Sequence, residues 1–530
     1  MSAERIWANS AVAGLVLVAA LLIVPGLGDR YLWDDEAETA LLAKNVIRFG
    51  VPVAWDGASL ISQECGSDYD ANYLWRQTPW LPIYLTAASL SVFGASAFAA
   101  RLPFALLGIL AVPSMYLLAR RLFAARLTAL VAAGSLLFSV PFLLHVRQCR
   151  YYALAIFAAI WILYFFFTLR RSPRLAAAGL ALSLTVLVHT SHLLFFGAVG
   201  GLALGFLIVS FDRKVLPWVL AGLIAPSIVN LPWLVGIDLG GQSGPLLTSS
   251  SAASFGANLG RYAGRIELYA FSALLLVTAL VVVAVATRMP MPLASAEARA
   301  CLVLVIFAIA HLLVVATVPF VFFRYVLTLL PVLSLLQARI IEVVATRSRV
   351  LAAAILLLAL LPDRADLVRG RFSVTLAKFV GEITHHVPGP IEGIVTHLKA
   401  GARPGDRVFI SYGDLPLRFH TDLQVRGGQG CQSLDGWPPP DWVIVRYFFR
   451  FRPVAPGAKE DADRTLQYLK TTVTLPRYRR VDLPVADTIW ENIPSLTGTS
   501  SGIRAIGRRS RSTRGCAVEI CCRSRRDWEQ

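Results

Sequence analysis

The chain has 530 residues, of which 56% are hydrophobic and only 16% charged, and its mean hydropathy is +0.62. Soluble domains typically carry about 25% charged residues, so this composition excludes an ordinary soluble protein and indicates a polytopic membrane protein. The formal net charge of +17 does not indicate a nucleic-acid partner, because basic loops between apolar segments and an Arg-rich tail supply most of it.

The first apolar segment, residues 11–27, is predicted to be a retained membrane span, because no small-residue cleavage site follows it. An acidic motif comes directly after it, Trp33-Asp34-Asp35-Glu36-Ala37-Glu38. A single acidic residue inside hydrocarbon costs about 2.5–3.5 kcal/mol, so these carboxylates must face water. Their mutual repulsion must be offset by a metal, by basic side chains or by a charged ligand.

Basic residues separate the later apolar runs and predict which loops are cytosolic. They are Arg120-Arg121, Arg170-Arg171, Arg213-Lys214, Arg288, and Arg347 with Arg349. The apolar runs between them pair into hairpins, at 127–146 and 150–169, 175–193 and 194–211, 216–235 and 267–287, and 299–318 and 321–340. A long polar loop containing Gly240-Gly241-Gln242-Ser243-Gly244 joins the third pair. Further spans near 102–119 and 350–362, with residues 79–94 as a helix on the outer surface, bring the predicted total to about eleven spans and place the N-terminus in the cytosol.

This topology places four polar clusters at the outer ends of helices: the acidic motif, residues 147–152, His189 with His192, and Arg324 with Tyr325. Charged groups at the edge of a membrane bundle are functional candidates, so we expect one polar cavity there. Simpler interpretations stay open. The arginines and tyrosines at 147–152 are also typical of interfacial anchors. The two histidines are also typical of residues inside a helix bundle that hydrogen-bond the backbone.

The composition changes near residue 363, where apolar runs shorten and strand-like stretches begin, at 407–412 and 442–445, after a turn motif at 402–406. We predict a mainly α fold, a transmembrane helix bundle with a small C-terminal α/β domain. The predicted parts are a transmembrane domain over 1–362 with its first outer loop at 28–100, an extracytoplasmic α/β domain over 363–495, and a basic, disordered tail over 496–530. The seven cysteines show no metal-ligand spacing and predict no disulfide framework. An approach of Cys65 to Cys149 outside the membrane stays open, but we expect each to be a structural or free thiol.

These clusters suit glycosyl transfer from a lipid phosphate. A carboxylate such as Asp35 removes the proton of an acceptor hydroxyl or amine, the general-base role. Arg147, Arg150 and Arg324 carry permanent charge in a forked geometry that holds a phosphate. A phosphate leaving group needs its charge neutralised rather than a proton, so arginines or a carboxylate-bound metal replace a general acid. Rings and hydroxyls for a sugar come from Tyr151, Tyr152 and Tyr325.

Several motifs follow one another along residues 10–345. They are the acidic motif with Ala40-Leu41-Leu42-Ala43-Lys44-Asn45, then Thr78-Pro79-Trp80-Leu81-Pro82, Phe93-Gly94, Ala99-Ala100-Arg101-Leu102-Pro103, Tyr116-Leu117-Leu118-Ala119-Arg120-Arg121-Leu122-Phe123, Arg147-Gln148-Cys149-Arg150-Tyr151-Tyr152 and Arg324-Tyr325. In this order the chain resembles the C superfamily of membrane glycosyltransferases, specifically glycosyltransferase family 39. That family includes protein O-mannosyltransferases and the aminoarabinose transferases that act on lipid A.

The resemblance implies that Asp35 is the catalytic base or orients the acceptor, with Glu36 as its acidic neighbour. It implies that donor phosphate and sugar are bound by Arg147, Arg150, Tyr152 and Arg324. The chain departs from the family at Thr78, where relatives carry His or Lys, and at Trp80, where they carry a second proline. We expect Arg76 to replace the phosphate or acceptor contact that residue 78 makes in relatives, and so to join the residues that bind the donor. A divalent metal held by Asp35 and Glu36, or by His189 and His192, stays open, since the acidic residue before the prolines is missing.

We therefore predict an inverting glycosyltransferase of the bacterial inner membrane whose active site faces the periplasm or exterior. Its donor would be a polyprenyl-phosphate-linked hexose or pentose, and its acceptor a cell-envelope glycolipid, such as a lipopolysaccharide, or a glycan. Membrane lipids are the other expected partners. The alternatives are a protein O-mannosyltransferase, a lipid-phosphate flippase or transporter, and a catalytically idle binding subunit.

Overall fold

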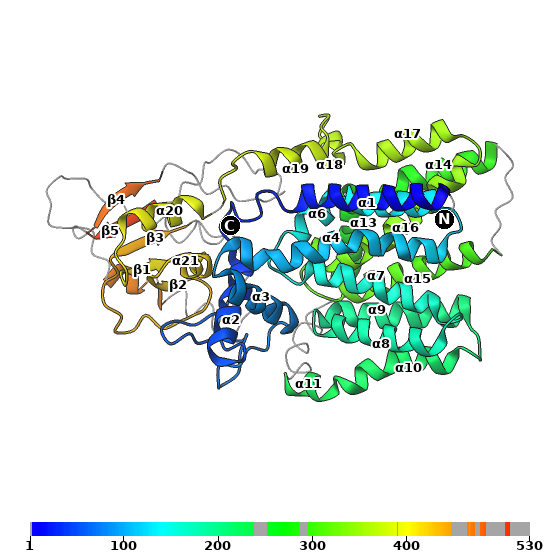
Figure 1. Cartoon of the computed structure of the whole chain (residues 1–530). Coiled ribbons are helices and arrows are strands. Elements are labelled where there is room, and N and C mark those ends of the chain that lie inside the picture. Colours follow the sequence, from blue (N-terminus) through cyan, green and yellow to red (C-terminus); the bar gives the residue numbers. More distant parts are fainter. Residues whose placement is uncertain are drawn as a thin grey trace. The chain divides into compact units, whose positions relative to one another are not determined.

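The computed structural model of the chain describes residues 3–237, 252–286, 295–389, 391–446, 464, 465, 467–471, 478–483 and 504–508 (Figure 1). The chain divides into two compact units. Unit 1 comprises Met1–Leu27, Thr78–Leu85 and Arg101–His385, and unit 2 comprises Gly28–Gln77, Thr86–Ala100 and His386–Gln530. The chain passes between the units inside the helices α3 (Leu81–Phe93) and α4 (Ala97–Leu122).

Unit 1 is built from apolar helices. Its further helices are α1 (Ala3–Ile23), α5 (Arg126–Leu137), α6 (Val140–Val146), α7 (Tyr152–Thr168), α8 (Pro173–Val188), α9 (His192–Gly205), η1 (Phe206–Ser210), α10 (Leu216–Val229), α11 (Leu231–Gly236), α13 (Ala252–Tyr269), α14 (Ala273–Ala286), α15 (Ala296–Ala316), η2 (Phe323–Leu329), α16 (Leu330–Ala345), α17 (Arg349–Leu360), α18 (Arg364–Val368) and α19 (Thr375–Thr384). Within the described residues, six helical segments are long and apolar enough to cross a membrane, or eight if each of two bent pairs is one span. Four apolar helices are shorter, namely α3, α7, α8 and α17. The prediction of about eleven spans had a helix on the outer surface at the position of α3 and membrane spans at the positions of the other three.

The polar connections predicted to be cytosolic contact one another within unit 1. Arg121 in the last turn of α4 donates to Thr168 at the end of α7 over 3.1 Å, and Arg339 of α16 pairs with Glu297 at the start of α15 over 2.8 Å. Arg126 also lies 3.6 Å from Glu4 near the N-terminus. These contacts agree with the predicted hairpins. In those hairpins the C-terminal ends of α4 and α7 lie on the same side of the bundle as the N-terminal ends of α1 and α15.

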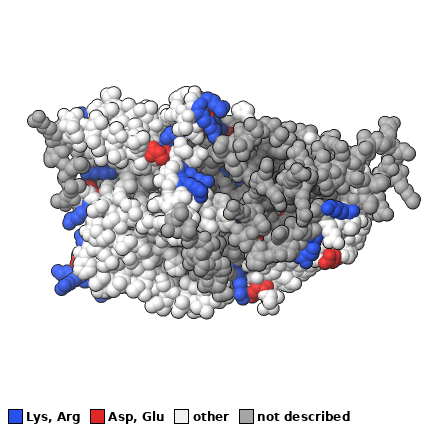
Figure 2. All heavy atoms as spheres, turned by 180° about the vertical axis from the view of Figure 1, so that it is seen from behind, with Lys and Arg blue, Asp and Glu red and all other residues white. Residues whose placement is uncertain are grey.

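The surface of unit 1 has the apolar character that a lipid environment requires. Large apolar side chains are widely exposed on its helices, for example Leu175, Leu274 and Val285, each exposed by more than 70%. On the face drawn in Figure 2, charged side chains are sparse over a broad white area and lie mainly toward its margins.

The helices α9 and α15 pack closely because α9 carries a row of glycines. A Cβ added at Gly197 would lie 2.5 Å from the His311 ring, one at Gly201 would lie 3.0 Å from the Phe307 backbone, and one at Gly205 would lie 2.9 Å from Val303. Glycines four residues apart share one helix face, so the two backbones approach each other as they do in small-residue membrane contacts.

One predicted loop contains a helix. We predicted a polar connection between residues 236 and 266, but α13 occupies Ala252–Tyr269. Its hydrophobic residues recur at helical spacing, yet its arginines and glycines lower the local hydropathy and so concealed it from a search for apolar runs. The predicted Gly240–Gly244 motif lies outside the described residues.

Unit 2 contains a five-stranded mixed sheet, of order β2-β1-β3-β5-β4. Its strands are β1 (Arg407–Ile410), β2 (Gln424–Gly427), β3 (Trp442–Val445), β4 (Tyr478–Asp482) and β5 (Arg504–Arg508), and its helices are α2 (Asp34–Phe49), α20 (Glu392–Gly401) and α21 (Asp414–His420). The strand β1 pairs in parallel with β2 and β3, while β5 pairs antiparallel with β3 and β4. The predicted strands at 407–412 and 442–445 are thus confirmed.

Alternation along β1 creates two apolar layers. Val408 and Ile410 are buried with Val395 and Leu398 of α20, whereas Phe409 is buried on the opposite face with Trp437. This is the pattern of a strand covered on both faces.

Two boundaries differ from the prediction. Residues 28–77 pack with the C-terminal sheet domain rather than with the helices, and the chain leaves unit 1 at His385 rather than at residue 362. The strand β5 lies within the segment 496–530 that we predicted as a disordered tail; the rest of that segment lies outside the described residues.

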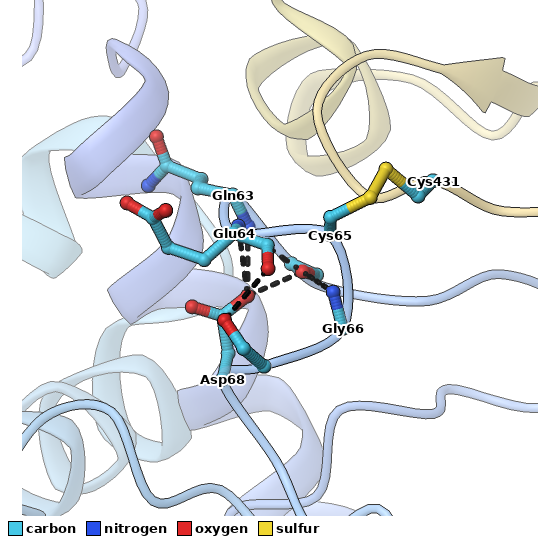
Figure 3. Close-up of a disulfide and its surroundings, with 8 residues drawn as sticks. Gln63, Glu64, Cys65, Gly66, Asp68 and Cys431 are labelled. Atoms are coloured by element: carbon cyan, nitrogen blue, oxygen red, sulfur yellow. Dashed lines mark hydrogen bonds between the residues drawn. A yellow bond between two sulfur atoms is a disulfide. The ribbon is translucent and has the colours of Figure 1, made fainter. Parts of the chain in front are cut away.

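Long-range contacts join residues 28–77 to the sheet domain. The backbone N–H of Leu32 donates to His420 over 2.9 Å, and the buried Arg418 pairs with Asp56. A disulfide links Cys65 to Cys431 across 366 residues (Figure 3). The expectation that Cys65 is a separate thiol is therefore wrong. Cys149 is buried and is not part of a disulfide among the described residues.

Candidate functional site

The acidic motif forms the first turn of α2. This helix begins at Asp34 and ends at Phe49, and the capping residue Gly50 has a φ of 81°, a left-handed conformation suited to glycine. Asp34, Asp35 and Glu36 lie in the first turn, where the partial positive charge of a helix N-terminus favours carboxylates. Local helix structure therefore offsets part of the repulsion that the sequence made apparent.

A side-chain amide lies between two carboxylates of this motif. The Gln63 Nε2 atom donates to Glu38 Oε2 over 2.7 Å and to Asp35 Oδ1 over 3.4 Å. Asp35 and Glu38 are three residues apart on one helix, so both can face the same loop. Glu38 and Glu36 are buried, with 4% and 1% of their surface exposed, while Asp35 is half-buried.

The neighbouring Glu64 adds a further carboxylate to the group. Burial raises the pKa of Glu64, and the negative charges of Glu38 and Asp35 raise it further. Carboxylates that share a partly buried site compete for ionisation, so this arrangement favours a proton held within the group. Such a group is chemically suited to accept a proton from a substrate hydroxyl.

The carboxyl ends of the parallel strands contribute residues that the sequence-based search missed. Tyr412 and Asp414 follow β1, and Arg446 follows β3. Burial raises the pKa of Tyr412, and the charge of Asp34 and its hydrogen bond with the tyrosine raise it further. Burial also raises the pKa of Asp414 to about 7; Arg418 opposes this shift and Asp34 reinforces it.

Tight backbone turns hold these side chains in place. Gly413, with φ of +91°, leaves room for the Arg446 guanidinium, which a Cβ would approach to 2.3 Å. That guanidinium donates to the Tyr412 carbonyl over 3.0 Å. A usable signal was present in the sequence, because polar residues directly after parallel strands gather at one sheet edge.

A second cluster, in unit 1, joins the segments around residues 150 and 324. The rings of Tyr151 and Tyr152 lie 4.7 Å apart, and Tyr152 contacts His145 with centroids 5.1 Å apart. The hydroxyl of Tyr151 interacts electrostatically with the guanidinium groups of Arg150 and Arg324. The structure thus brings together two predicted segments that are more than 170 residues apart in sequence.

The arginines of this cluster differ in their surroundings. Arg324 lies over the Phe322 ring at 4.1 Å and near the Tyr325 ring at 5.8 Å, and Arg150 is buried with 8% of its surface exposed. Arg147 donates to the backbone carbonyl of Ile23 over 2.6 Å, so it caps the end of α1. The same guanidinium donates to the Leu22 carbonyl over 3.3 Å and lies 5.9 Å from the centre of the Phe379 ring.

Residues of α13 and α15 hold η2, which carries Arg324 and Tyr325. His311 Nε2 lies 3.0 Å from the Tyr325 carbonyl oxygen and 3.1 Å from Thr328 Oγ1. Arg265 of α13 donates to the carbonyl of Val321, just before η2. This bond to the backbone gives Arg265 a structural role in unit 1.

The remaining predicted residues have different surroundings. Arg76 pairs with Asp70 over 2.8 Å in unit 2. His189 Nε2 lies 2.8 Å from Asn230 Oδ1, which is a side-chain partner rather than the backbone partner of the simpler interpretation. His192 Nε2 is buried and has no hydrogen-bond partner in the described part of the chain.

No three His, Cys, Asp or Glu side chains lie close enough together to hold a metal ion, as far as the described part of the chain extends. Asp35 and Glu36, and likewise His189 and His192, therefore lack a third ligand of these types there. We derive no chemical step through a metal.

Comparisons with known proteins give one matching family model and several similar solved structures. Residues 77–234 match the family model described as dolichyl-phosphate-mannose-protein mannosyltransferase. The chain is similar to ArnT from Cupriavidus metallidurans bound to undecaprenyl phosphate, with a TM-score of 0.57 and 14% identity over 94% of this chain and 98% of that one. The same protein in the apo state has a TM-score of 0.56, with 14% identity over 95% of this chain and 98% of that one.

The chain is also similar to the archaeal oligosaccharyltransferase AglB from Archaeoglobus fulgidus, in complex with an inhibitory peptide and a dolichol-phosphate. That TM-score is 0.52, with 13% identity over 93% of this chain and 75% of that one. No curated protein matches the sequence. The predicted GT-C membrane fold is confirmed, and the resemblance to family 39 is supported by the family match.

Proposed function

We propose that this chain is a membrane glycosyltransferase that moves one sugar from a polyprenyl-phosphate carrier to a cell-envelope glycolipid or glycan. The proposal rests on a cluster of three carboxylates, Asp35, Glu38 and Glu64, in a chain with the GT-C fold. The Gln63 amide donates to the first two of them. The family match and the two similar solved structures, one bound to undecaprenyl phosphate and one to dolichol-phosphate, support a lipid-phosphate donor.

In the proposed reaction the acceptor oxygen forms a bond to the anomeric carbon of the sugar while the bond from that carbon to the phosphate oxygen breaks. Asp35 takes the acceptor proton, and Glu36 is its acidic neighbour in the motif. The leaving group is a polyprenyl phosphate, which carries away the electron pair of the broken bond. A single displacement of this kind inverts the anomeric configuration.

The leaving phosphate requires positive charge. We assign this role to Arg150 and Arg324, with Arg147 alongside, because guanidinium forks match phosphate oxygens. The rings of Tyr151, Tyr152 and Tyr325 are assigned to the sugar and the first isoprene units. Arg76, which is paired with Asp70, is assigned a supporting role toward the acceptor.

We further propose that unit 2 lies outside the cytosol, at the periplasmic face of a bacterial inner membrane. Stable disulfides form in oxidising compartments, and unit 2 contains the Cys65–Cys431 bond. Cysteines introduced at the exposed Ala71 in unit 2 and the exposed Arg174 in the first turn of α8 test this with a membrane-impermeant maleimide. Labelling of residue 71 alone in intact spheroplasts is expected, whereas labelling of residue 174 alone reverses the orientation.

The decisive experiment is a transfer assay on the purified full-length chain. Undecaprenyl-phosphate-linked sugars are offered with glycolipid acceptors, and the product anomer is determined. The variant Asp35→Asn should lower kcat by at least about a hundredfold, because it removes the base but keeps the side-chain shape. The matched control Asp435→Asn alters an exposed carboxylate of the same unit and should leave kcat nearly unchanged. Full activity of Asp35→Asn would remove Asp35 from the catalytic role.

Protein O-mannosylation is the second candidate, because the matched family model carries that description. Peptide acceptors in the same assay separate the two functions. Transport of the lipid phosphate without any transfer product would contradict both.

A further inference from the structure

The carboxylates of the proposed site depend on one loop for their orientation. Gln63 places its amide against both Glu38 and Asp35, at 2.7 and 3.4 Å. An amide nitrogen has two hydrogens, so it can serve two carboxylate oxygens at once.

A buried aspartate fixes the backbone that carries this amide (Figure 3). One oxygen of Asp68, Oδ2, accepts from the backbone N–H groups of Gln63 and Glu64, each over 3.0 Å, and from the Ser62 hydroxyl. Asp68 is completely buried. Three donors converge on one buried oxygen, so these hydrogen bonds hold the loop backbone in one conformation.

The same loop is fastened to the C-terminal domain. Cys65, two residues after Gln63, is bonded to Cys431, and its backbone N–H donates to the Gln429 carbonyl over 3.1 Å. Leu60 on the other side donates to the Gln432 side chain over 3.3 Å. The loop is therefore anchored on both sides of Gln63 to residues 429–432.

We infer that Gln63 is a positioning residue, which holds Asp35 and Glu38 in their working orientation and is itself held by Asp68 and by the anchor to Cys431. The inference rests on the proposed function of Asp35. The C-terminal domain thereby has a role in catalysis beyond acceptor selection, because its residues 429–432 anchor the loop that carries Gln63.

The charge environment of Asp35 favours an amide donor beside it. On α2 it lies next to Asp34 and Glu36 and three residues before Glu38, and the loop presents Glu64. The sheet domain presents Tyr412, which interacts with Asp34 and Asp35, and Asp414, which interacts with Asp34, while the Arg446 guanidinium donates to the Tyr412 carbonyl. The Gln63 amide donates to both Asp35 and Glu38 and so reduces the repulsion between these two carboxylates.

The test is the isosteric substitution Gln63→Glu in the full-length chain. It keeps the shape of the side chain but replaces the donor with a further carboxylate. We expect kcat to fall roughly ten- to hundredfold, as for the loss of a hydrogen bond to a charged group, with KM for donor and acceptor changed by less than about threefold. The matched control Gln424→Glu makes the same change at an exposed position of β2 and should leave kcat within about twofold of wild type.

Wild-type kcat in Gln63→Glu, or an effect confined to KM, would overturn the inference. A wild-type chain that transfers no sugar would instead contradict the proposed function. A second measurement then still tests the contact between Gln63 and Glu38. Thermal unfolding of Gln63→Ala, Glu38→Ala and the double variant forms a cycle. The inference requires that the two shifts in Tm are not additive, whereas additive shifts would contradict it.

Discussion

The disulfide between Cys65 and Cys431 should dominate the stability of unit 2. We consider the double substitution Cys65→Ser/Cys431→Ser and, in parallel, reduction of the wild-type chain. The bond closes a loop of 366 residues. The chain-entropy relation for a loop of that length gives about 6 kcal/mol.

The effective loop is shorter, because the apolar helices between the two cysteines stay inserted in the membrane when unit 2 unfolds. A loop of about 100 flexible residues gives about 4.7 kcal/mol, and measured losses on removing native disulfides are about 2–5 kcal/mol. For a unit of roughly 200 residues this corresponds to a decrease in Tm of roughly 5–15 °C.

Thermal unfolding of the full-length chain in detergent, with and without a phosphine reductant, measures the effect. The control is Cys301→Ser, which alters a thiol of α15 that forms no disulfide. Thiol labelling under denaturing conditions should find two more reactive cysteines after reduction than before it. An unchanged Tm together with an unchanged thiol count would refute the assignment of this bond.

Three further predictions follow from buried contacts. Burial raises the pKa of Asp68 to about 6, above the unfolded value of 3.8, so the native state keeps this proton longer and unit 2 should lose stability as pH rises from about 4 to about 6; Asp68→Asn should flatten that part of a plot of Tm against pH. Gly201→Ala should destabilise unit 1 by about 1–3 kcal/mol, because the new methyl meets the α15 backbone, whereas the control Gly200→Ala, with nothing within 4 Å, should be nearly neutral in a chemical unfolding experiment. Arg418→Leu should cost about 3 kcal/mol, because the partner carboxylate of Asp56 loses its ion pair, and equal stability of this variant would show that the pair is worth little.

The apolar runs and the charges between them predicted the helices well, because insertion into lipid depends on composition over about 20 residues. The acidic motif was identified for the same reason, since four carboxylates beside a span are incompatible with hydrocarbon wherever the chain later goes. The strands around Val408 and Val443 were equally visible from short apolar runs next to turn residues. The helix α13 was missed because its arginines, such as Arg265, resemble loop residues until their backbone partners are known.

The arrangement of the site required the tertiary structure. Nothing near Gln63 in the sequence distinguishes it from an ordinary loop glutamine, and its importance lies in contacts with Glu38 and Asp35 on a helix some 25 residues earlier. The pairing of Cys65 with Cys431 could not be read from cysteine spacing, because seven cysteines allow many pairings and only geometry selects among them.

By itself, the sequence determined that the chain is a membrane bundle with a water-facing acidic turn and a small sheet domain, since hydropathy and charge act over short stretches of chain. The tertiary structure alone decided that residues 28–77 join the sheet domain and that His311 supports the segment of Arg324. Those contacts form between residues far apart in sequence, and their energies depend on burial and on hydrogen-bond geometry that exist only after the chain has folded.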